Sequence, residues 1–594
     1  MPVFKAPVDD TLFILNDVLG YERYMNLPGF ADASPDIVEA ILQEGARISE
    51  EVLFPLNQVG DQEGCTRHDD ATVSTPKGFK QAYKQYCEGG WLGLAASADY
   101  GGQGLPYALH TAVSEYMISA NMSLMMYPGL TQGAVAAINE HGTDEQKAKF
   151  LPKMIEGIWT GTMNLTEPHC GTDLGLLRTK AVPQGDGSYK ISGQKIFISA
   201  GEHDMSDNII HLVLARIEGA PEGVKGISLF IVPKFMVGDD GALGDRNPVT
   251  CGSLEEKMGI HGNSTCVMNY DEATGYLIGT ENAGLKAMFV MMNEARLGVG
   301  LQGQAMGEIA YQNAVAYARE RLQGRSLSGA KFPDKKADPI IVHPDVRRTL
   351  LTIRAFNEAG RAFMLWTALK SDVAHKSEVD SDIQQADDLL TLVTPVVKGV
   401  LTDKGFDHAV MAQQMFGGHG YIEEWGMSQY VRDACCAFHF DGHALDLVGR
   451  KLGQNGGRAV MAFFKEVGDF CEENRENEEL ALYTKSLKKG LNDLQASTMW
   501  LMENAMAKPD NAGAASTDYM HLFGLVSLGY MWALMAKAAV EKRDAGADGK
   551  EEFLASKLLV GKFYMERIMP ETALRKTRIE TGCETMMELA EEAF

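Results

Sequence analysis

The segment MNLTEPHCGTD, residues 163–173, has the most chemically informative spacing in the chain. A Thr-Glu-Pro turn followed by a Gly-Thr-Asp turn brings hydroxyl groups and free backbone N–H groups close together, and such groups suit a planar hydrogen-bonding ring or a pyrophosphate. The segment KIFIS, residues 195–199, follows in a strand-like pattern and offers an aromatic ring and a hydroxyl to the same ligand. Side-chain packing alone does not explain this pair, so we expect a ligand site.

A second motif, GVGLQG at residues 298–303, matches the dinucleotide fingerprint G-x-G-x-x-G. It lies inside a helical pattern, whereas a dinucleotide site requires a strand, a turn and a helix. We therefore expect these small residues to let two helices approach closely. The sequence contains no P-loop, HExxH, GxSxG or zinc-ligand spacing, so we expect no metal site and find no motif for a hydrolase.

The periodicity of apolar residues predicts the elements that must position these motifs. Helical periods begin at Ser34-Pro35-Asp36, give way at Trp159 to strand-like alternation around the turn Gly185-Asp186-Gly187, and return at Leu285. The fold class is therefore mostly α with a central β-barrel domain and a C-terminal helical extension. The expected parts are a lead-in (1–35), an α-helical domain (36–158), a β-barrel domain (159–282), an α-helical bundle domain (283–470) and an extra helical domain (471–594).

Composition limits the possible partners and the compartment. The 594 residues include 80 Asp plus Glu and 55 Lys plus Arg, for a formal net charge of −25, and a surface this acidic repels nucleic acid and anionic membranes. There is no run of 18 apolar residues and no signal peptide, so we expect no membrane association. Nine cysteines without CxxC spacing are typical of reduced thiols in the cytoplasm.

Six segments occur in the order found in one enzyme family: TEP, GTD, GQKIFIS, ARERLQGR (318–325), HPDVRRTLL (343–351) and QMFGGHGYIEE (414–424). With the predicted domain order, the chain resembles the acyl-CoA dehydrogenases over essentially its whole length, and its extra C-terminal helices resemble a long bacterial subgroup. The resemblance implies FAD-dependent α,β-dehydrogenation of an acyl-CoA to the trans-2-enoyl-CoA. It also implies a short-chain substrate with 3-methylmercaptopropionyl-CoA as first candidate, an electron-transfer flavoprotein as electron acceptor, and a homodimer or homotetramer.

The same resemblance assigns residues to each part of the site. It places Arg296 near the CoA tail, and Arg321 and Gln323 at the FAD pyrophosphate, supplied from a neighbouring subunit. The residues expected at the flavin's pyrimidine and phosphate side are Met163, Leu165, Thr166, Gly171 and Thr172. Phe197 and Ser199 are expected at the other face of the flavin, and Gln414, Gly417 and Gly418 at the adenosine, also across a subunit interface.

The catalytic base departs from the family pattern. Relatives carry Glu in a Tyr-Glu-Gly sequence, whereas this chain has Phe440-Asp441-Gly442 and lacks about four of the residues that follow in the family. Aspartate is one methylene shorter, and a displacement of about 1 Å can reduce a rate by on the order of 10²-fold. Asp441 is therefore the working base, a residual carboxylate in a weak enzyme, or part of a non-redox acyl-CoA lyase that needs only α-proton removal. We expect the flanking His439 and His443 to lie in a loop or face solvent.

Overall fold

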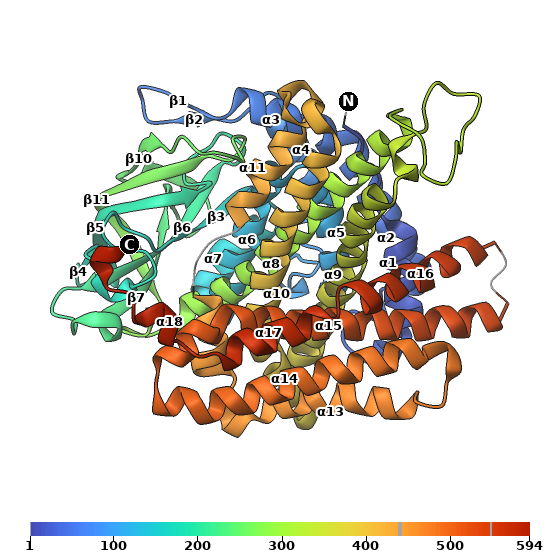
Figure 1. The fold of residues 1–594 in the computed structure, drawn as a ribbon. Helices are drawn as coiled ribbons and strands as arrows, with labels where there is room; N and C mark the ends of the chain where they lie inside the picture. Colours follow the sequence, from blue (N-terminus) through green and yellow to red (C-terminus); the bar gives the residue numbers. More distant parts are fainter. Residues whose placement is uncertain (1, 438–441, 547–548) are drawn as a thin grey trace. The chain divides into compact units, whose positions relative to one another are not determined.

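Figure 1 shows the fold of the computed structural model, which describes residues 2–437, 442–546 and 549–594. The chain forms two compact units. Unit 1 is made of Met1–Leu42, Tyr107–Glu115 and Val299–Phe594, and unit 2 of Gln43–Pro106 and Tyr116–Gly298. Unit 1 therefore joins the N-terminal segment, one short internal segment and the C-terminal half of the chain.

Unit 2 contains a closed ring of five strands, because each neighbouring pair is hydrogen-bonded: β11 with β5, β5 with β4, β4 with β6, β6 with β7, and β7 with β11. β3 adds to β6 and β10 to β11, and two short ribbons complete the strands. The central β-barrel expected from the sequence is thus confirmed. The strands are β1 (Thr66–Arg67), β2 (Val73–Ser74), β3 (Trp159–Asn164), β4 (Lys180–Pro183), β5 (Ser188–Ser199), β6 (Asn208–Ile217), β7 (Ile227–Pro233), β8 (Phe235–Val237), β9 (Leu243–Arg246), β10 (Val249–Leu254) and β11 (Thr265–Ile278).

The two faces of β6 and β7 explain why both strands are almost continuously apolar. Along β6, Leu212 and Leu214 join a core shared with helices, whereas Val213 and Ala215 join the core of the barrel. A strand covered on both faces carries a run of apolar residues and shows little alternation. The β4–β5 hairpin turn has glycines with positive φ, +84° at Gly185 and +89° at Gly187, as its sequence predicts.

Helices of unit 2 pack on the outer face of the sheet. The buried cluster there joins residues of α6, α7 and the start of α8 to β3, β6 and β7. Thr143 caps the start of α7 with a capping box, in which its hydroxyl accepts from Gln146 N. The helices of this unit, with those that continue into unit 1, are α2 (Pro35–Ile48), α3 (Asn57–Glu63), α4 (Phe79–Glu88), α5 (Tyr107–Ala120), α6 (Met122–His141), α7 (Asp144–Ile155) and α8 (Gly284–Glu320).

Unit 1 is helical. Its further helices are α1 (Val8–Leu12), α9 (Pro344–Lys376), α10 (Asp380–Met415), α11 (Met427–Ala437), α12 (His443–Asp446), α13 (Arg458–Glu473), α14 (Ala481–Ala507), α15 (Asp510–Asp544), α16 (Glu551–Arg567), α17 (Glu571–Glu580) and α18 (Glu584–Met587). The sequence pattern predicts one helix over 571–592, which is wrong: Gly582 adopts a φ of +76° and ends the helical path between α17 and α18.

The glycines of GVGLQG confirm the expected close approach of two helices. A Cβ at Gly303 on α8 would lie 2.5 Å from Leu401 O and 2.6 Å from Thr402 Cα on α10. Gly405 on α10 is equally tight, since its Cβ would lie 2.1 Å from Gly303 O. The motif therefore serves helix packing in unit 1, and no strand–turn–helix unit surrounds it.

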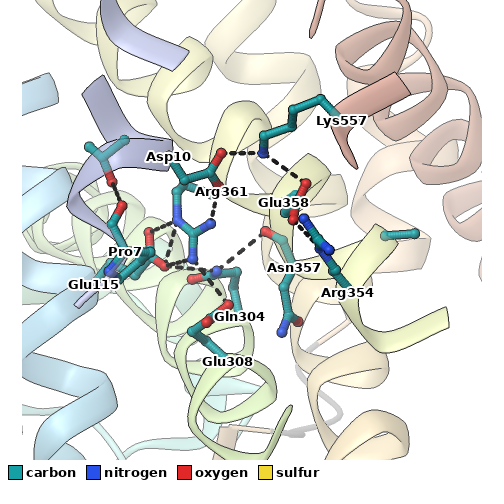
Figure 2. Close-up of polar contacts among 12 residues, drawn as sticks. Pro7, Asp10, Glu115, Gln304, Glu308, Arg354, Asn357, Glu358, Arg361 and Lys557 are labelled. Carbon is teal, nitrogen blue, oxygen red and sulfur yellow. Dashed lines mark hydrogen bonds and ion pairs between the residues drawn. The ribbon is translucent and has the colours of Figure 1, made fainter. Parts of the chain in front are cut away.

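A buried network of charges joins several helices of unit 1 (Figure 2). Arg361, 1% exposed, pairs with Asp10, with Glu115 at 2.6 Å and with Glu308 at 3.1 Å. Lys557 on α16 pairs with the same Asp10 and, at 2.7 Å, with Glu358, which also accepts from Arg354. Residues 1–35, a weakly periodic lead-in by sequence, thus supply the carboxylate that joins α9 to the C-terminal extension.

One helix of the described chain, α15, is long and apolar enough to cross a membrane. In its most apolar window, 89% of the residues are buried inside the protein. Such burial is that of a core helix, since a lipid-facing helix would leave its apolar side chains exposed on the protein surface.

Candidate functional site

The loop that begins at Leu165 is bonded directly to β5. Ile196 N donates to Thr166 O at 2.9 Å, and Lys195 Nζ donates to Leu165 O at 2.9 Å. Met163 lies just before the loop, half-buried near the end of β3. The structure therefore brings the TEP turn and the KIFIS strand together, as their pairing in the sequence predicts.

Glu167 anchors the base of this loop. Its carboxylate accepts from Lys195 Nζ at 2.8 Å, from Thr179 N at 3.0 Å and from Arg178 N at 2.7 Å. Burial alone would raise the pKa of Glu167, but Lys195 and these donors together lower it below the ordinary value, so the carboxylate is charged. Residues 168–178 are thereby closed at their base.

The tip of the loop carries the predicted Gly171 and Thr172, both exposed. Among the described residues, no atom lies within 4 Å of the position a Cβ would take on Gly171, so its backbone is open to a ligand. Asp173 accepts from Gly175 N at 3.1 Å and turns the chain back toward Glu167. A loop with a charged, buried base and an exposed glycine tip can present backbone N–H groups to a phosphate.

Phe197 lies on a bulge of β5. The pairing with β11 shifts between Cys266–Ile198 and Met268–Lys195, so one extra residue stands on β5 at this point. Phe197 adopts a φ of +59°, which is rare for a bulky residue, and its side chain is 60% exposed. Ser199, half-buried, ends the same strand. A strained backbone that turns an aromatic ring outward beside Thr166 is the arrangement expected for a ring-binding face.

Sequence reasoning assigned no role to Glu167 or Lys195, although both lie within the quoted motifs. Lys195 is fully buried, and a buried lysine requires a carboxylate partner. The sequence did contain a signal for this pair: Lys195 lies in a strand-like segment that otherwise alternates regularly between apolar and polar residues. The two residues hold the loop to the strand.

The second group of predicted residues lies in unit 1, where α8 ends. Arg321 O accepts from Ile340 N at 2.8 Å, and Gln323 N donates to Asp338 O at 2.9 Å, so both residues lie at the start of an ordered loop. Asp338 organises that loop. Backbone donors, of which Ser326 N contributes most, lower the pKa of Asp338 to about 2. The side chains of Arg321 and Gln323 are exposed.

An aromatic cluster joins the end of α8, which carries Arg321, to the turn after α10, which carries the third group of predicted residues. Tyr317, one turn before Arg321, stacks on Phe416 at 4.2 Å between ring centroids, and its hydroxyl lies 3.0 Å from His419 Nδ1. His419 stacks on Trp425 at 4.6 Å. Gln414, Gly417 and Gly418, at the end of α10 and in the following turn, are all exposed. The pyrophosphate and adenosine residues expected from sequence thus belong to one exposed end of unit 1.

Two predicted residues remain, Arg296 and Asp441. Arg296 is half-buried on α8, in the part of that helix that belongs to unit 2. Asp441, the predicted base, lies outside the described residues. His443, expected in a loop or facing solvent, is instead 5% exposed and begins α12.

Comparisons with known proteins give family models and relatives that are similar to this chain along its length. The family models for the acyl-CoA dehydrogenase N-terminal, middle and C-terminal domains match residues 62–158, 162–273 and 282–444, and the model "Acetyl-CoA dehydrogenase C-terminal like" matches residues 463–590. A 3-methylmercaptopropionyl-CoA dehydrogenase of Ruegeria pomeroyi is 40% identical over 98% of both chains. The broad-specificity linear acyl-CoA dehydrogenase FadE5 of Mycobacterium tuberculosis is 34% identical over 100% of both chains.

The fold is also that of a solved structure. An acyl-CoA dehydrogenase from Bacillus anthracis, complexed with FAD, aligns with a TM-score of 0.74 and 18% identity, covering 94% of this chain and 89% of the other. At this identity the likeness concerns the fold alone. It extends beyond the barrel and the bundle to the C-terminal helices, because the alignment covers nearly the whole chain.

Proposed function

Because the chain belongs to the acyl-CoA dehydrogenase family, we propose that it catalyses α,β-dehydrogenation of a short-chain acyl-CoA thioester to the trans-2-enoyl-CoA. Members of this family are FAD-dependent oxidoreductases, and so is this protein. As first substrate we propose 3-methylmercaptopropionyl-CoA, which gives its name to the relative that is 40% identical. A short linear acyl-CoA is the second choice, because another full-length relative is named for linear substrates.

The observation that carries this proposal is the outward-facing Phe197 on its bulge, next to the open loop at Thr166 and Gly171. These groups fit a flavin: an aromatic face for the planar ring system, with hydroxyl and backbone N–H donors beside it. FAD, when bound, supplies the acceptor for the hydrogen that leaves the β-carbon as hydride. Leu165, Thr166, Phe197 and Ser199 would hold its ring.

Other residues would hold the phosphates, the adenosine and the CoA. Gly171 and Thr172 would contact the phosphate side, Arg321 and Gln323 the pyrophosphate, and Arg296 the CoA tail. Gln414, Gly417 and Gly418 would contact the adenosine. We propose that the carboxylate of Asp441 removes the α-proton, because Asp441 aligns with the sequence position of the family's catalytic base. The α-proton is weakly acidic, so its removal also requires hydrogen-bond donors at the thioester oxygen.

The test is anaerobic titration of the purified flavoprotein with 3-methylmercaptopropionyl-CoA, butyryl-CoA and a long-chain acyl-CoA. We expect the short substrates to bleach the oxidised flavin absorbance. The Asp441→Asn variant should keep its FAD and lose the bleaching by at least about 10²-fold in rate, since the base is gone. Asp469→Asn, at an exposed position on α13, is the matched control and should react normally.

Two outcomes would contradict this assignment. Full activity in Asp441→Asn would remove Asp441 as the base. Product formed without an electron acceptor and without flavin bleaching would identify a non-redox elimination, the lyase that the altered base motif leaves open.

We further propose that the electrons pass to an electron-transfer flavoprotein and that the enzyme works in the cytoplasm as a homodimer or homotetramer. The scattered cysteines without CxxC spacing support the compartment. The exposed end of unit 1 that carries Arg321 and Gln414 supports assembly, because those residues would contact FAD of a neighbouring subunit. Sedimentation of the holoenzyme measures the state directly.

A further inference from the structure

The loop that carries Gly171 also contains three different metal-ligand types in one short segment. Glu167, His169 and Cys170 each offer one ligand atom, and these atoms all lie within 4.8 Å of one another. A tetrahedral zinc ion, with bonds of about 2.0 to 2.3 Å, holds its ligand atoms about 3.3 to 3.8 Å apart. The set therefore requires the ligand atoms to approach one another by at most about 1 to 1.5 Å, within reach of side-chain rotations.

The carboxylate of Glu167 divides its two oxygens between different neighbours. Oε1 accepts from Lys195 Nζ and from the backbone and hydroxyl of Thr179. Oε2 accepts from Arg178 N and lies 3.7 Å from His169 Nε2. A carboxylate oxygen has two lone pairs, so Oε2 keeps one for a cation while Oε1 holds the lysine. The ion pair with Lys195 thus need not break.

The ring of His169 is also held by a backbone carbonyl that is not one of the three ligand groups. His169 Nε2 lies 3.0 Å from Leu176 O, and a carbonyl only accepts, so Nε2 carries a proton there. The same Nε2 is the ring nitrogen nearest to Glu167, 3.7 Å from Oε2. A cation shared with Glu167 would therefore displace the contact with Leu176 O and use the Nε2 lone pair, and Nδ1 would then carry the proton of the neutral ring.

Accessibility completes the arrangement. The His169 side chain is 34% exposed, whereas Cys170 is 5% exposed and the Glu167 side chain 3%. A cation can therefore enter past the histidine and reach a thiol and a carboxylate that are shielded from water. Thiolate, imidazole and carboxylate together favour Zn²⁺ over Mg²⁺ or Ca²⁺, which prefer oxygen ligands only.

We propose that Glu167, His169 and Cys170 form a binding site for a thiophilic divalent cation such as Zn²⁺, with a fourth position open to solvent. The site lies at the base of the loop whose tip carries Gly171 and Thr172. The sequence pattern predicts no metal site, because these ligands stand at spacings of two and one residues, outside the usual zinc patterns. The site stands apart from the dehydrogenation, since none of the three residues is assigned to the substrate.

The test uses the purified flavoprotein and Co²⁺ as a spectroscopic substitute for Zn²⁺. We expect one equivalent of Co²⁺ to produce a cobalt–thiolate charge-transfer band in the difference spectrum, and Zn²⁺ to displace it. Competition with a chromogenic chelator then gives the Zn²⁺ affinity. Cys170→Ser should abolish the charge-transfer band, and Cys170→Ser and His169→Gln should each weaken Zn²⁺ binding by about tenfold or more.

Cys87→Ser is the matched control. Cys87 is a half-buried thiol of unit 2, on α4, and it lies outside the ligand set. This variant should bind Co²⁺ as the parent does. Glu167→Gln is left out, because loss of the anchor at Lys195 would disturb folding itself.

Three results would overturn the proposal. A Co²⁺ spectrum without a thiolate band would exclude Cys170. Unchanged Zn²⁺ affinity in Cys170→Ser with loss in His169→Gln would mean adventitious binding by an exposed histidine only. An equal effect of Cys87→Ser would mean that the metal acts on thiols in general. In each case the flavin spectrum confirms that the variant is folded.

Discussion

At the scale of single residues, the left-handed backbone conformation of Phe197 should lower the stability of the fold. The exposed ring offsets this cost only when a ligand packs against it. A left-handed conformation costs an L-residue about 1–2 kcal/mol, whereas glycine loses about 0.5–1 kcal/mol more in chain entropy on folding. Phe197→Gly should therefore be more stable than Phe197→Ala, by about 0.5–1 kcal/mol. Urea unfolding of the two apoproteins measures the difference.

The same pair of substitutions at Lys190, also on β5, is the control. Lys190 has no positive φ, so Lys190→Gly should be less stable than Lys190→Ala by a similar amount. If the Phe197→Ala variant is as stable as the Phe197→Gly variant or more stable, the backbone at position 197 is not strained. Both variants at position 197 should also retain FAD less well than the parent.

Glu115 gives a pH dependence of opposite sign to that of most carboxylates. Burial, reinforced by the neighbouring Glu308 and opposed by Arg361, raises the pKa of Glu115 above its ordinary value of 4.5. A carboxyl with a raised pKa stabilises the fold below its unfolded pKa and loses that contribution as the pH rises through the folded pKa. The unfolding free energy of the parent, relative to Glu115→Gln, should therefore fall as the pH rises above about 4.5.

Urea unfolding of both proteins at a series of pH values measures this difference. Glu424→Gln, at an exposed position of unit 1, controls for the loss of one charge. A difference between parent and Glu115→Gln that grows with pH would mean that Arg361 dominates over burial.

At the scale of elements, the contact between α8 and α10 rests on Gly303. The Cβ of an alanine there would lie 2.5 Å from Leu401 O on α10, well inside van der Waals contact, so the helices must separate. Overpacking of this kind costs about 1–3 kcal/mol or more, and we expect Gly303→Ala to lower the free energy of unfolding by at least that amount. Thermal and urea unfolding of the variant measure it.

Gly298, in the same helix and the same motif, is the matched control. Among the described residues no atom lies within 4 Å of its Cβ position, so Gly298→Ala should stabilise the protein by about 0.5–1 kcal/mol through helix propensity. Equal effects at both positions would mean that the motif does not define the packing of α8 on α10.

The same scale explains what the sequence could predict. Long helices such as α9 and the β4–β5 hairpin follow from apolar period and turn residues, which are local signals. The bulge at Phe197 and the closure of the barrel depend on which strands pair, and no local pattern carries that information. The pairing of Thr166 with Ile196 was predictable because both lie in motifs of one ligand site, whereas the anchor Glu167–Lys195 was not recognised.

At the scale of the whole chain, segments far apart in the sequence meet in one buried network. Asp10 comes from the first helix, Glu115 from α5, Glu308 from α8, Arg361 from α9 and Lys557 from α16 (Figure 2). Four carboxylates, including Glu358, surround three cations in this network. No local period reveals a partner 547 residues away, so the lead-in appeared weakly structured by sequence.

This network makes the stability of the C-terminal extension depend on the N-terminal segment. Burial alone would raise the pKa of Asp10, but Lys557 and Arg361 lower it below the ordinary value, so both cations rely on its charge. Asp10→Asn should lower the unfolding free energy by about 3–5 kcal/mol, the usual effect of removing one partner of a buried ion pair. It should also speed hydrogen exchange in peptides of α16 and α9, measured by mass spectrometry. Asp9→Asn, at the exposed neighbouring position, should change neither quantity, and similar effects of both variants would show that the network does not join the two ends of the chain.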